Sequence, residues 1–227
     1  NVGVDYFLKY GNRDRKAQAY YLRAVVREDN KSGNQADWAN DLLLATKEVK
    51  GSGNHMLAAM INLRYAVVLN DRKWYDASLP YLEKGLEEAE KAGSLAFQVT
   101  ALINLSHRAL FLGDENKDYS EAIEYANRAA EISKEDDNDY ARALYNLGAC
   151  YSRNGQFDKA LECASTAVRA QERLFREGKR KARVRYAVLA DAFRKMNIPD
   201  SALFYAAKEM EASDLIAKLS GSQLSYI

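Results

Sequence analysis

The chain has 227 residues, of which 48% are apolar, and its 33 basic and 32 acidic side chains give a formal net charge of +1. Because the charges are nearly balanced, the protein has no long-range electrostatic field that would attract nucleic acid or an anionic membrane. Only two prolines and twelve glycines interrupt a sequence that is rich in Ala, Leu, Glu, Lys and Arg. These are strong helix formers, so the composition predicts an all-α protein with almost no strand.

The sequence of the N-terminal quarter predicts the end of one helix, followed by a helical hairpin. Residues Val4–Tyr10 form a helix that Gly11 and Asn12 stop. Residues Arg15–Lys50 then form two helices, the first with apolar and aromatic residues around Tyr20 and the second around Leu42. The segment Gly51–Asn54 ends the second helix and offers Asn54 as the N-cap of the next one.

A fixed period dominates the rest of the chain. Leu63, Leu105, Leu147 and Leu189 lie 42 residues apart. Each stands in a similar phrase, and these are AMINLRYAVVL from Ala59, ALINLSHRALF from Ala101, ALYNLGACYSR from Ala143 and RYAVLADAFRK from Arg185. Self-similarity at such a period indicates stacked helical repeats, in which no single unit can bury its apolar face alone.

The third unit shows the pattern of large and small residues most clearly. Its first helix carries Leu144, Leu147, Gly148 and Tyr151, a turn covers residues 154–157, and its second helix carries Ala160, Ala164 and Ala167. This pattern resembles the tetratricopeptide repeat family. The resemblance implies a right-handed superhelical solenoid of antiparallel helix pairs, whose small residues let the two helices of a pair approach closely.

The chain departs from the family pattern in three places. Its period exceeds the usual repeat of about 34 residues, and we expect the added length mainly after the second helices of units three and four. In unit two, residues 113–118 are expected to lengthen the inner turn, and in unit one Arg64 occupies a position for a small residue.

We predict a single solenoid domain over residues 1–227. It has weak repeats in 1–54, clear repeats in 55–206 and a C-terminal helix extension in 207–227. We expect the chain to be a piece of a longer protein, because it stops at Ile227 in what reads as the first turn of a new helix.

The resemblance places one set of first-helix positions on the inner groove of the solenoid. Asn62, Asn104 and Asn146 recur there in three successive units. A carboxamide donates and accepts at once, so a series of them can bind the backbone of an extended peptide whatever its side chains. The alternative is that each asparagine bonds a neighbouring helix and keeps the stack in register.

Aromatic and basic residues project to the same groove. Tyr65, His107 and Tyr145 are predicted to contact apolar side chains of a ligand, and Arg142 and Arg153 to hold carboxylates. The same projection also gives Ser152, Asp191, Arg194 and Lys195. The alternative for the aromatics is packing in the core. The predicted peptide-binding residues are Asn62, Asn104, Asn146, Tyr65, His107, Arg142, Tyr145 and Arg153.

Other residues favour structural roles. The stretch Arg173–Arg185 is basic and the stretch Glu131–Asp139 is acidic. They form solvated faces, or they attract each other between neighbouring turns or between copies of the chain. Cys150 and Cys163 lack the spacing of a zinc site or a disulfide scaffold, so we expect small core fillers and no metal. We expect neither nucleic-acid binding nor membrane contact, since no apolar run approaches the roughly 20 residues needed to cross a bilayer.

The sequence predicts a binding protein rather than an enzyme. It contains no phosphate loop, zinc-protease motif or nucleophile elbow, and His55 and His107 lack an adjacent nucleophile pattern. We therefore predict no cofactor and no catalytic residue. The compartment stays open between cytoplasm and periplasm, as does the oligomeric state.

The predicted function is a non-catalytic module that binds a protein or peptide in its concave groove. The phrase FLKYGNRDRKAQAYY, followed by tandem units, resembles the sensory half of bacterial regulators. One alternative is an assembly scaffold that acts through its convex face or by self-association. A nucleic-acid binder using Arg173–Arg185 is a third hypothesis, which requires a steep dependence of binding on salt.

Overall fold

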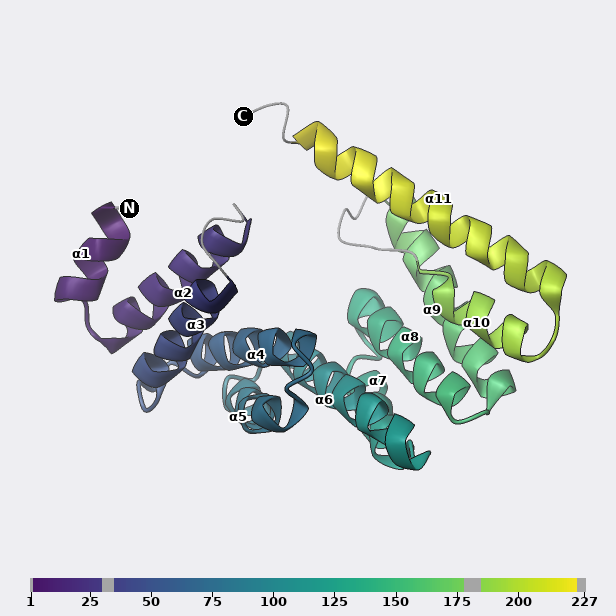
Figure 1. Cartoon of the computed structure of the whole chain (residues 1–227), viewed down its shortest axis with the longest axis horizontal. Helices are drawn as coiled ribbons and strands as arrows, with labels where there is room; N and C mark the ends of the chain where they lie inside the picture. The colour runs from purple at the N-terminus through teal and green to yellow at the C-terminus, as the bar shows by residue number, and fades with distance from the viewer. Residues whose placement is uncertain (1, 30–34, 178–184, 224–227) are drawn as a thin grey trace. The chain divides into compact units, whose positions relative to one another are not determined.

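A computed structural model describes residues 2–29, 35–177 and 185–223, with side chains placed within 3–28, 37–177 and 185–214. Over these residues the chain forms eleven helices and no strand (Figure 1). They are α1 (Val2–Tyr10), α2 (Arg13–Asp29), α3 (Gln35–Val49), α4 (His55–Asp71), α5 (Tyr75–Lys91), α6 (Leu95–Asn116), α7 (Ser120–Ile132), α8 (Asp137–Arg153), α9 (Phe157–Arg176), α10 (Ala187–Lys195) and α11 (Pro199–Gln223). The all-α prediction is confirmed, whereas the turn predicted at Ile227 lies outside the described residues.

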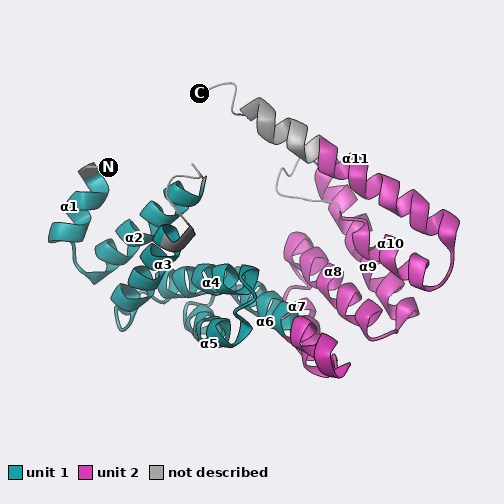
Figure 2. Ribbon diagram, in the orientation of Figure 1, with its two compact units in different colours: residues 1–108 teal, residues 109–227 magenta. Residues whose placement is uncertain are grey.

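The chain divides into two compact units, residues 1–108 and 109–227 (Figure 2). The first contains α1 to α5 and the start of α6, and the second contains the end of α6 and α7 to α11. Within the units, α2–α3, α4–α5, α8–α9 and α10–α11 pack as neighbouring pairs. A single solenoid domain over the whole chain stays a prediction.

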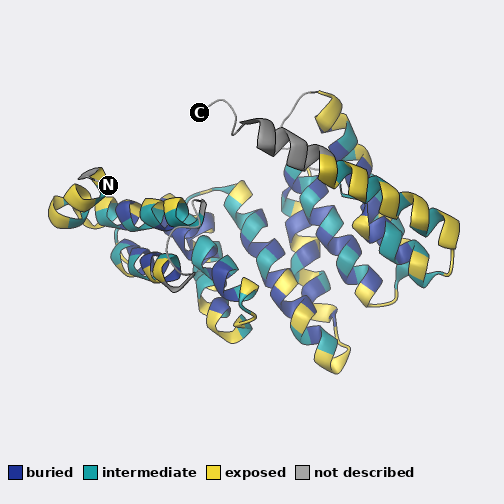
Figure 3. Cartoon of the chain, turned by 45° about the horizontal axis from the view of Figure 1, so that its top comes forward, coloured by how far each residue is buried: buried dark blue, intermediate teal, exposed yellow. Residues whose placement is uncertain are grey.

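The periodic leucines form the core of the pairs. Leu63, Leu105, Leu147 and Leu189 are each at most 5% exposed. Buried residues recur along the helices at helical spacing, while exposed residues lie on the opposite sides and in the turns (Figure 3). The predicted N-cap is also confirmed, because the side chain of Asn54 accepts a hydrogen bond from the backbone N–H of Leu57 at 3.1 Å.

Small residues bring the paired helices into close contact. A Cβ added to Gly148 on α8 would lie 3.2 Å from the carbonyl oxygen of Ala160 on α9. In the α4–α5 pair, Gly85 takes this role, since a Cβ there would lie 2.5 Å from Leu63 Cδ2. Arg64 does not disturb this pair, because its guanidinium forms an ion pair with Glu28 of α2.

The hairpin turns repeat one helix-ending geometry. Gly155 has a φ of 74°, and the next residue, Gln156, donates its backbone N–H to the carbonyl of Tyr151 at 2.9 Å. Lys73 and Asn197 occupy the equivalent place in their turns, with φ values of 62° and 59°. This six-to-one bond satisfies helix-end carbonyls and reverses the chain within three residues.

The structure shows where units two and three hold the residues that exceed the usual repeat length. The 20 residues of α9, against 13 in α7, confirm an extended second helix in unit three. The inner turn expected from residue 113 was wrong, because α6 continues as helix to Asn116. Gly113 permits this, since a Cβ there would lie only 2.3 Å from the carbonyl oxygen of Asp118.

One described helix, α6, is long and apolar enough to cross a membrane by length and composition alone. This differs from the expectation that no run approaches such a length. Half of its apolar window is buried inside the protein, including Leu102 and Leu105. The buried helix of a stacked repeat has the same two properties, so the finding is weak support for a membrane span.

The contact at Gly113 gives a test of the packing. We expect Gly113→Ala to lower the free energy of unfolding by about 1–3 kcal/mol, because the new methyl group meets backbone that cannot move aside cheaply. Urea denaturation followed by circular dichroism measures the change. Gly3→Ala is the control, since its Cβ would meet open space and alanine favours helix. Equal stabilities of the two variants would contradict the close approach.

Candidate functional site

The first unit contains a hollow of about 870 Å³ between α3, the turn after it, α4 and α5. Its apolar wall includes Leu43, Val49 and Ala58, and Tyr81 adds an aromatic ring. Asn62 lies in the same wall. The hollow therefore joins one predicted site residue with residues of the preceding hairpin and of the following second helix.

Two of the three predicted asparagines are held in the same way. The amide nitrogen of Asn62 donates to the carbonyl of Ala58 at 2.8 Å, and that of Asn104 donates to Thr100 at 2.8 Å. Each bond reaches back four residues along its own helix, so equivalent carboxamides have equivalent anchors. The bond occupies one of four hydrogen-bonding positions on the amide, which leaves three for other partners.

Asn146 lies on α8 in the second unit and is only 2% exposed. Arg142, Tyr145 and Arg153 come from the same helix. Arg142 pairs with Asp139 at 2.6 Å, one turn away on α8. Tyr145 packs against a core cluster that includes Leu189, with the guanidinium of Arg185 5.3 Å from its ring centroid.

Arg153 binds the end of α6 within the second unit. Its guanidinium lies 2.5 Å from a carboxylate oxygen of Asp114, which also accepts a hydrogen bond from the Tyr119 hydroxyl at 2.9 Å. Burial raises the pKa of Asp114, but the bonds from Arg153 and Tyr119 outweigh it and hold that pKa below its ordinary value. Arg153 therefore has a structural partner as well as a predicted ligand role.

The predicted aromatic residues differ in their surroundings. Tyr65 packs against the cluster of Ala24, Leu42 and Val68 and lies edge-on to Tyr81, with ring centroids 4.7 Å apart. This burial raises the pKa of its hydroxyl. His107 is exposed on α6. The position of Tyr65 fits the packing alternative better than a ligand contact.

Sequence reasoning missed the charged wall of the hollow. Lys47 and Lys50 come from α3 and the turn after it, and Lys84, Glu88 and Lys91 come from α5. The repeat pattern places only first-helix positions on the groove, so it does not point to residues of second helices. The spacing of the α5 residues at 84, 88 and 91 is the signal that shows them on one helix face.

Glu88 is the carboxylate of this wall. Its side chain is 9% exposed and lies 2.7 Å from the Nδ1 atom of His55 and 3.0 Å from the ammonium of Lys84. Burial raises the pKa of Glu88, but the hydrogen bonds from His55 and Lys84 outweigh it, and the net pKa is below its ordinary value. Glu88 is therefore a charged group whose partners come from two helices.

The projected polar residues of the second unit meet as a cluster between α8 and α10. The hydroxyl of Ser152 donates to Asp191 at 2.8 Å, and the ammonium of Lys195 lies 2.9 Å from the same carboxylate. Arg194 contacts its other oxygen at 2.5 Å. Burial raises the pKa of Asp191, yet these three partners together hold that pKa below its ordinary value.

The remaining candidates agree with structural roles over the described part of the chain. Arg173 pairs with Asp137 at 2.5 Å, which joins the basic and acidic stretches, while residues 178–184 of the basic stretch lie outside the described residues. Cys150 is buried, as expected of a core filler, whereas Cys163 is only half-buried, and this burial raises the pKa of its thiol to about 11. No group of three His, Cys, Asp or Glu side chains suited to a metal ion occurs among the described residues.

The Asp191 cluster predicts a pH dependence. Because its folded-state pKa is depressed, Asp191 stabilises the fold above its ordinary pKa and loses that contribution as the pH falls through the folded-state value. We expect Asp191→Asn to cost less than about 1 kcal/mol at pH 7, since the group is partly exposed, and to cost still less at pH 3. Thermal unfolding at both pH values measures this.

The control for that experiment is Asp214→Asn, an exposed position in the interior of α11. It should leave the difference between the two pH values unchanged. If the cost of Asp191→Asn stays the same at pH 3, the charge of the carboxylate contributes nothing to the cluster.

Comparison with protein families identifies the repeat. A family model described as tetratricopeptide repeat matches residues 105–173 and 139–213. None of the curated proteins compared with the chain matches its sequence. The family match therefore covers the second half of the chain, where the repeat pattern of large and small residues is clearest.

Solved structures extend the comparison to the first half. BtubC (BKLC) from P. vanneervenii is 22% identical over 73% of this chain and 66% of its own, with a TM-score of 0.61. The apo form of RapI is 17% identical, with a TM-score of 0.70, over 91% of this chain and 73% of its own. A Rap protein in complex with Competence and Sporulation Factor is 19% identical over 96% of this chain and 71% of its own, with a TM-score of 0.57.

These likenesses show the fold, and the chain spans only about two thirds of the length of BtubC. The leucine period, the small residues at the helix contacts and the family match point to one family. Residues 105–213 of this chain consist of tetratricopeptide repeats.

Proposed function

We propose that this chain is a non-catalytic module that binds a peptide or protein segment along its first helices. The observation that carries the proposal is the shared anchoring of Asn62 and Asn104, together with the place of Asn62 in the wall of the hollow. Equivalent amides with equivalent anchors repeat one hydrogen-bonding unit along the stack.

An extended peptide is the ligand that such a series suits. Its backbone offers one N–H and one C=O at each residue, and a carboxamide can bond to both kinds of group. Recognition through the backbone leaves side-chain specificity to the surfaces beside the amides. In the first unit that neighbouring surface is the hollow with its apolar and charged walls.

The similar structures support binding but do not decide it. One is a Rap protein complexed with Competence and Sporulation Factor, and another is aspartyl phosphate phosphatase F from Bacillus subtilis, at 15% identity and a TM-score of 0.63. One fold therefore carries both a phosphatase and a factor-binding protein, so function must be argued from the site. The amides of this site and the ring of Tyr81 in the hollow suit recognition of a polypeptide.

We further propose that the chain is the sensory part of a bacterial regulator. The complex of a similar Rap protein with Competence and Sporulation Factor supports the binding part of this proposal. In such an arrangement, binding of a segment would change the conformation of the repeats. Residues elsewhere in a longer protein would then carry out the regulatory response.

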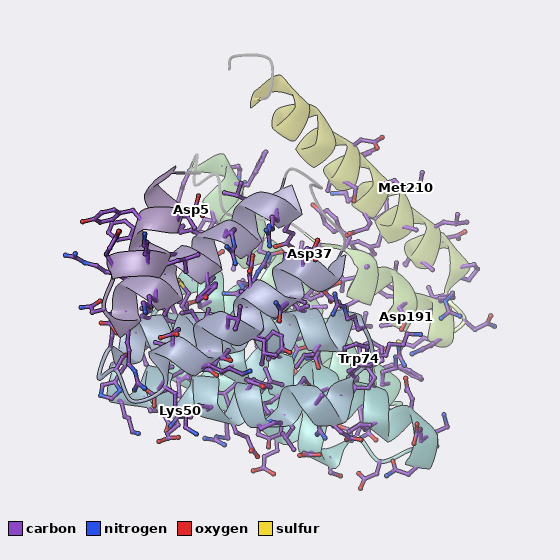
Figure 4. All side chains as sticks on the ribbon, turned by 60° about the vertical axis from the view of Figure 1, so that its left-hand side comes forward. Asp5, Asp37, Lys50, Trp74, Asp191 and Met210 are labelled. Atoms are coloured by element: carbon purple, nitrogen blue, oxygen red, sulfur yellow. The ribbon has the colours of Figure 1, made fainter. Side chains whose placement is uncertain are left out.

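An assembly scaffold is the second candidate, and exposed apolar residues on a second helix favour it. Leu203 and Met210 of α11 are each 70% exposed, and Phe204 is 55% exposed. Met210 lies near the middle of α11 (Figure 4). A hollow of about 560 Å³ lies beside Leu203, between α10 and α11. Such a face is suited to contact with another protein surface.

The asparagine series gives the main test. Peptides selected on the whole chain from a random-peptide phage library should bind the Asn62→Ala/Asn104→Ala variant about tenfold or more weakly, because two backbone hydrogen bonds are lost. Isothermal titration calorimetry measures the affinity. Asn40→Ala/Asn127→Ala, at two exposed helical positions, should bind as the parent does. Unchanged affinity in the first variant, together with a large loss of stability, would assign the asparagines to structure alone.

The scaffold candidate predicts self-association through α11. If it holds, sedimentation velocity should show a dimer or larger species that Leu203→Gln/Met210→Gln converts to monomer, since the variant removes the apolar contact. Exposed residues tolerate this change, so the circular dichroism spectrum should stay the same. A monomer at every concentration would exclude self-association and leave groove binding as the better account.

A further inference from the structure

We propose that the hollow between α3, α4 and α5 binds an acidic stretch of the polypeptide ligand, whose carboxylates are held by lysines at its rim. This inference rests on the proposed function, because it names the chemistry of the segment that the first helices bind. It assigns a role to second-helix and turn residues that the repeat pattern does not single out.

The charge of the wall is the first argument. Lys47, Lys50, Lys84 and Lys91 line the hollow, against Glu88 as its one carboxylate. Lys47 and Lys50 are exposed and form no ion pair with another residue that the structure describes. Lys50 lies in the turn that follows α3 (Figure 4). Two ammonium groups at this rim are therefore available to a ligand.

The other charges of the wall do not cancel this excess. Glu88 is nearly buried, and its charge is shared among His55 at 2.7 Å, Lys84 at 3.0 Å and Lys91 at 3.7 Å. Glu87, which is not part of the wall, also pairs with Lys84 and Lys91. The two pairs of Glu87 join residues on one face of α5, and exposed ion pairs of this kind are weak. An incoming carboxylate therefore meets a net positive rim.

The start of α4 adds to the same field. Asn54, its N-cap, and His55, its first residue, both line the hollow. The N-terminal end of a helix carries a partial positive charge that favours an anion nearby. Helix end and lysines thus act in the same direction, and they do so beside the carboxamide of Asn62.

Size and apolar surface favour a polypeptide over a free anion. A hollow of about 870 Å³ lies in the range of pockets that enclose drug-sized ligands, and a single phosphate fills only a small part of it. Leu43, Val49, Ala58 and Tyr81 supply apolar wall that a free anion does not use. A segment with carboxylates at the rim and aliphatic carbon inside satisfies both kinds of surface.

The test compares two labelled peptides on the full chain. One alternates glutamate with alanine and the other glutamine with alanine at equal length, and fluorescence anisotropy gives both affinities. We expect only the glutamate peptide to bind, with an affinity that falls as salt is raised. Lys47→Gln/Lys50→Gln should weaken its binding about three- to tenfold. The matched control Lys9→Gln/Lys73→Gln removes the same charge at exposed positions outside the hollow and should leave binding unchanged.

Several outcomes would overturn the inference. One is equal affinity for the two peptides, and another is an equal loss of affinity in the two lysine variants. A third is full competition by inorganic phosphate at the concentration of the peptide. The fourth is tighter binding of a single-stranded oligonucleotide that depends in the same way on Lys47 and Lys50. If the phage library yields asparagine-dependent peptides without acidic residues, only the acidic preference fails. If the library yields no peptide at all, the proposed function itself fails.

Discussion

Close contact between paired helices at small residues is the constraint on which this fold depends. Gly148 and Ala160 bring the backbones of α8 and α9 together, and Gly85 receives Leu63 in the α4–α5 pair. Because a hairpin with so close a contact has no room for a larger side chain there, the leucine opposite is fixed in the core. The 42-residue period of buried leucines is the sequence record of this packing, repeated from one pair to the next.

The same constraint decides where polar groups can lie. In the α4–α5 and α8–α9 pairs, Gly, Ala and Leu fill the helix contacts, and charged groups lie in the turns and on helix faces that neighbouring pairs leave partly open. The α2–α3 pair differs, because its buried Asp41 is held by Arg23 and Arg27. The hollow of the first unit is one such place, with Lys50 in the turn and Lys84 on α5. In the second unit, Ser152 and Asp191 meet between two helices in the same manner. The residues proposed to bind a ligand thus lie apart from the Gly, Ala and Leu contacts that hold the pairs together.

The sequence predicted what depends on local pattern. The buried leucines, the N-cap at Asn54 and the helices around Tyr20 and Leu42 follow from periodicity and capping, which short stretches of chain determine. The lysine wall of the hollow depends on contacts between segments distant in sequence, and the continuation of α6 past Gly113 depends on the close approach of Gly113 to Asp118. Their geometry follows from packing distances, which a repeat pattern does not contain, and the same holds for the pairing of Arg64 with Glu28.

The two roles considered for the asparagines are compatible. A bond from Asn62 to the carbonyl of Ala58 fixes the rotamer of the side chain but leaves three of the four bonding positions of its amide for a ligand. A side chain held in this way loses less conformational entropy on binding than a free one, so the internal bond would strengthen the proposed recognition. Asn104 has the same anchor. A structural bond at these positions is therefore the expected companion of a binding role.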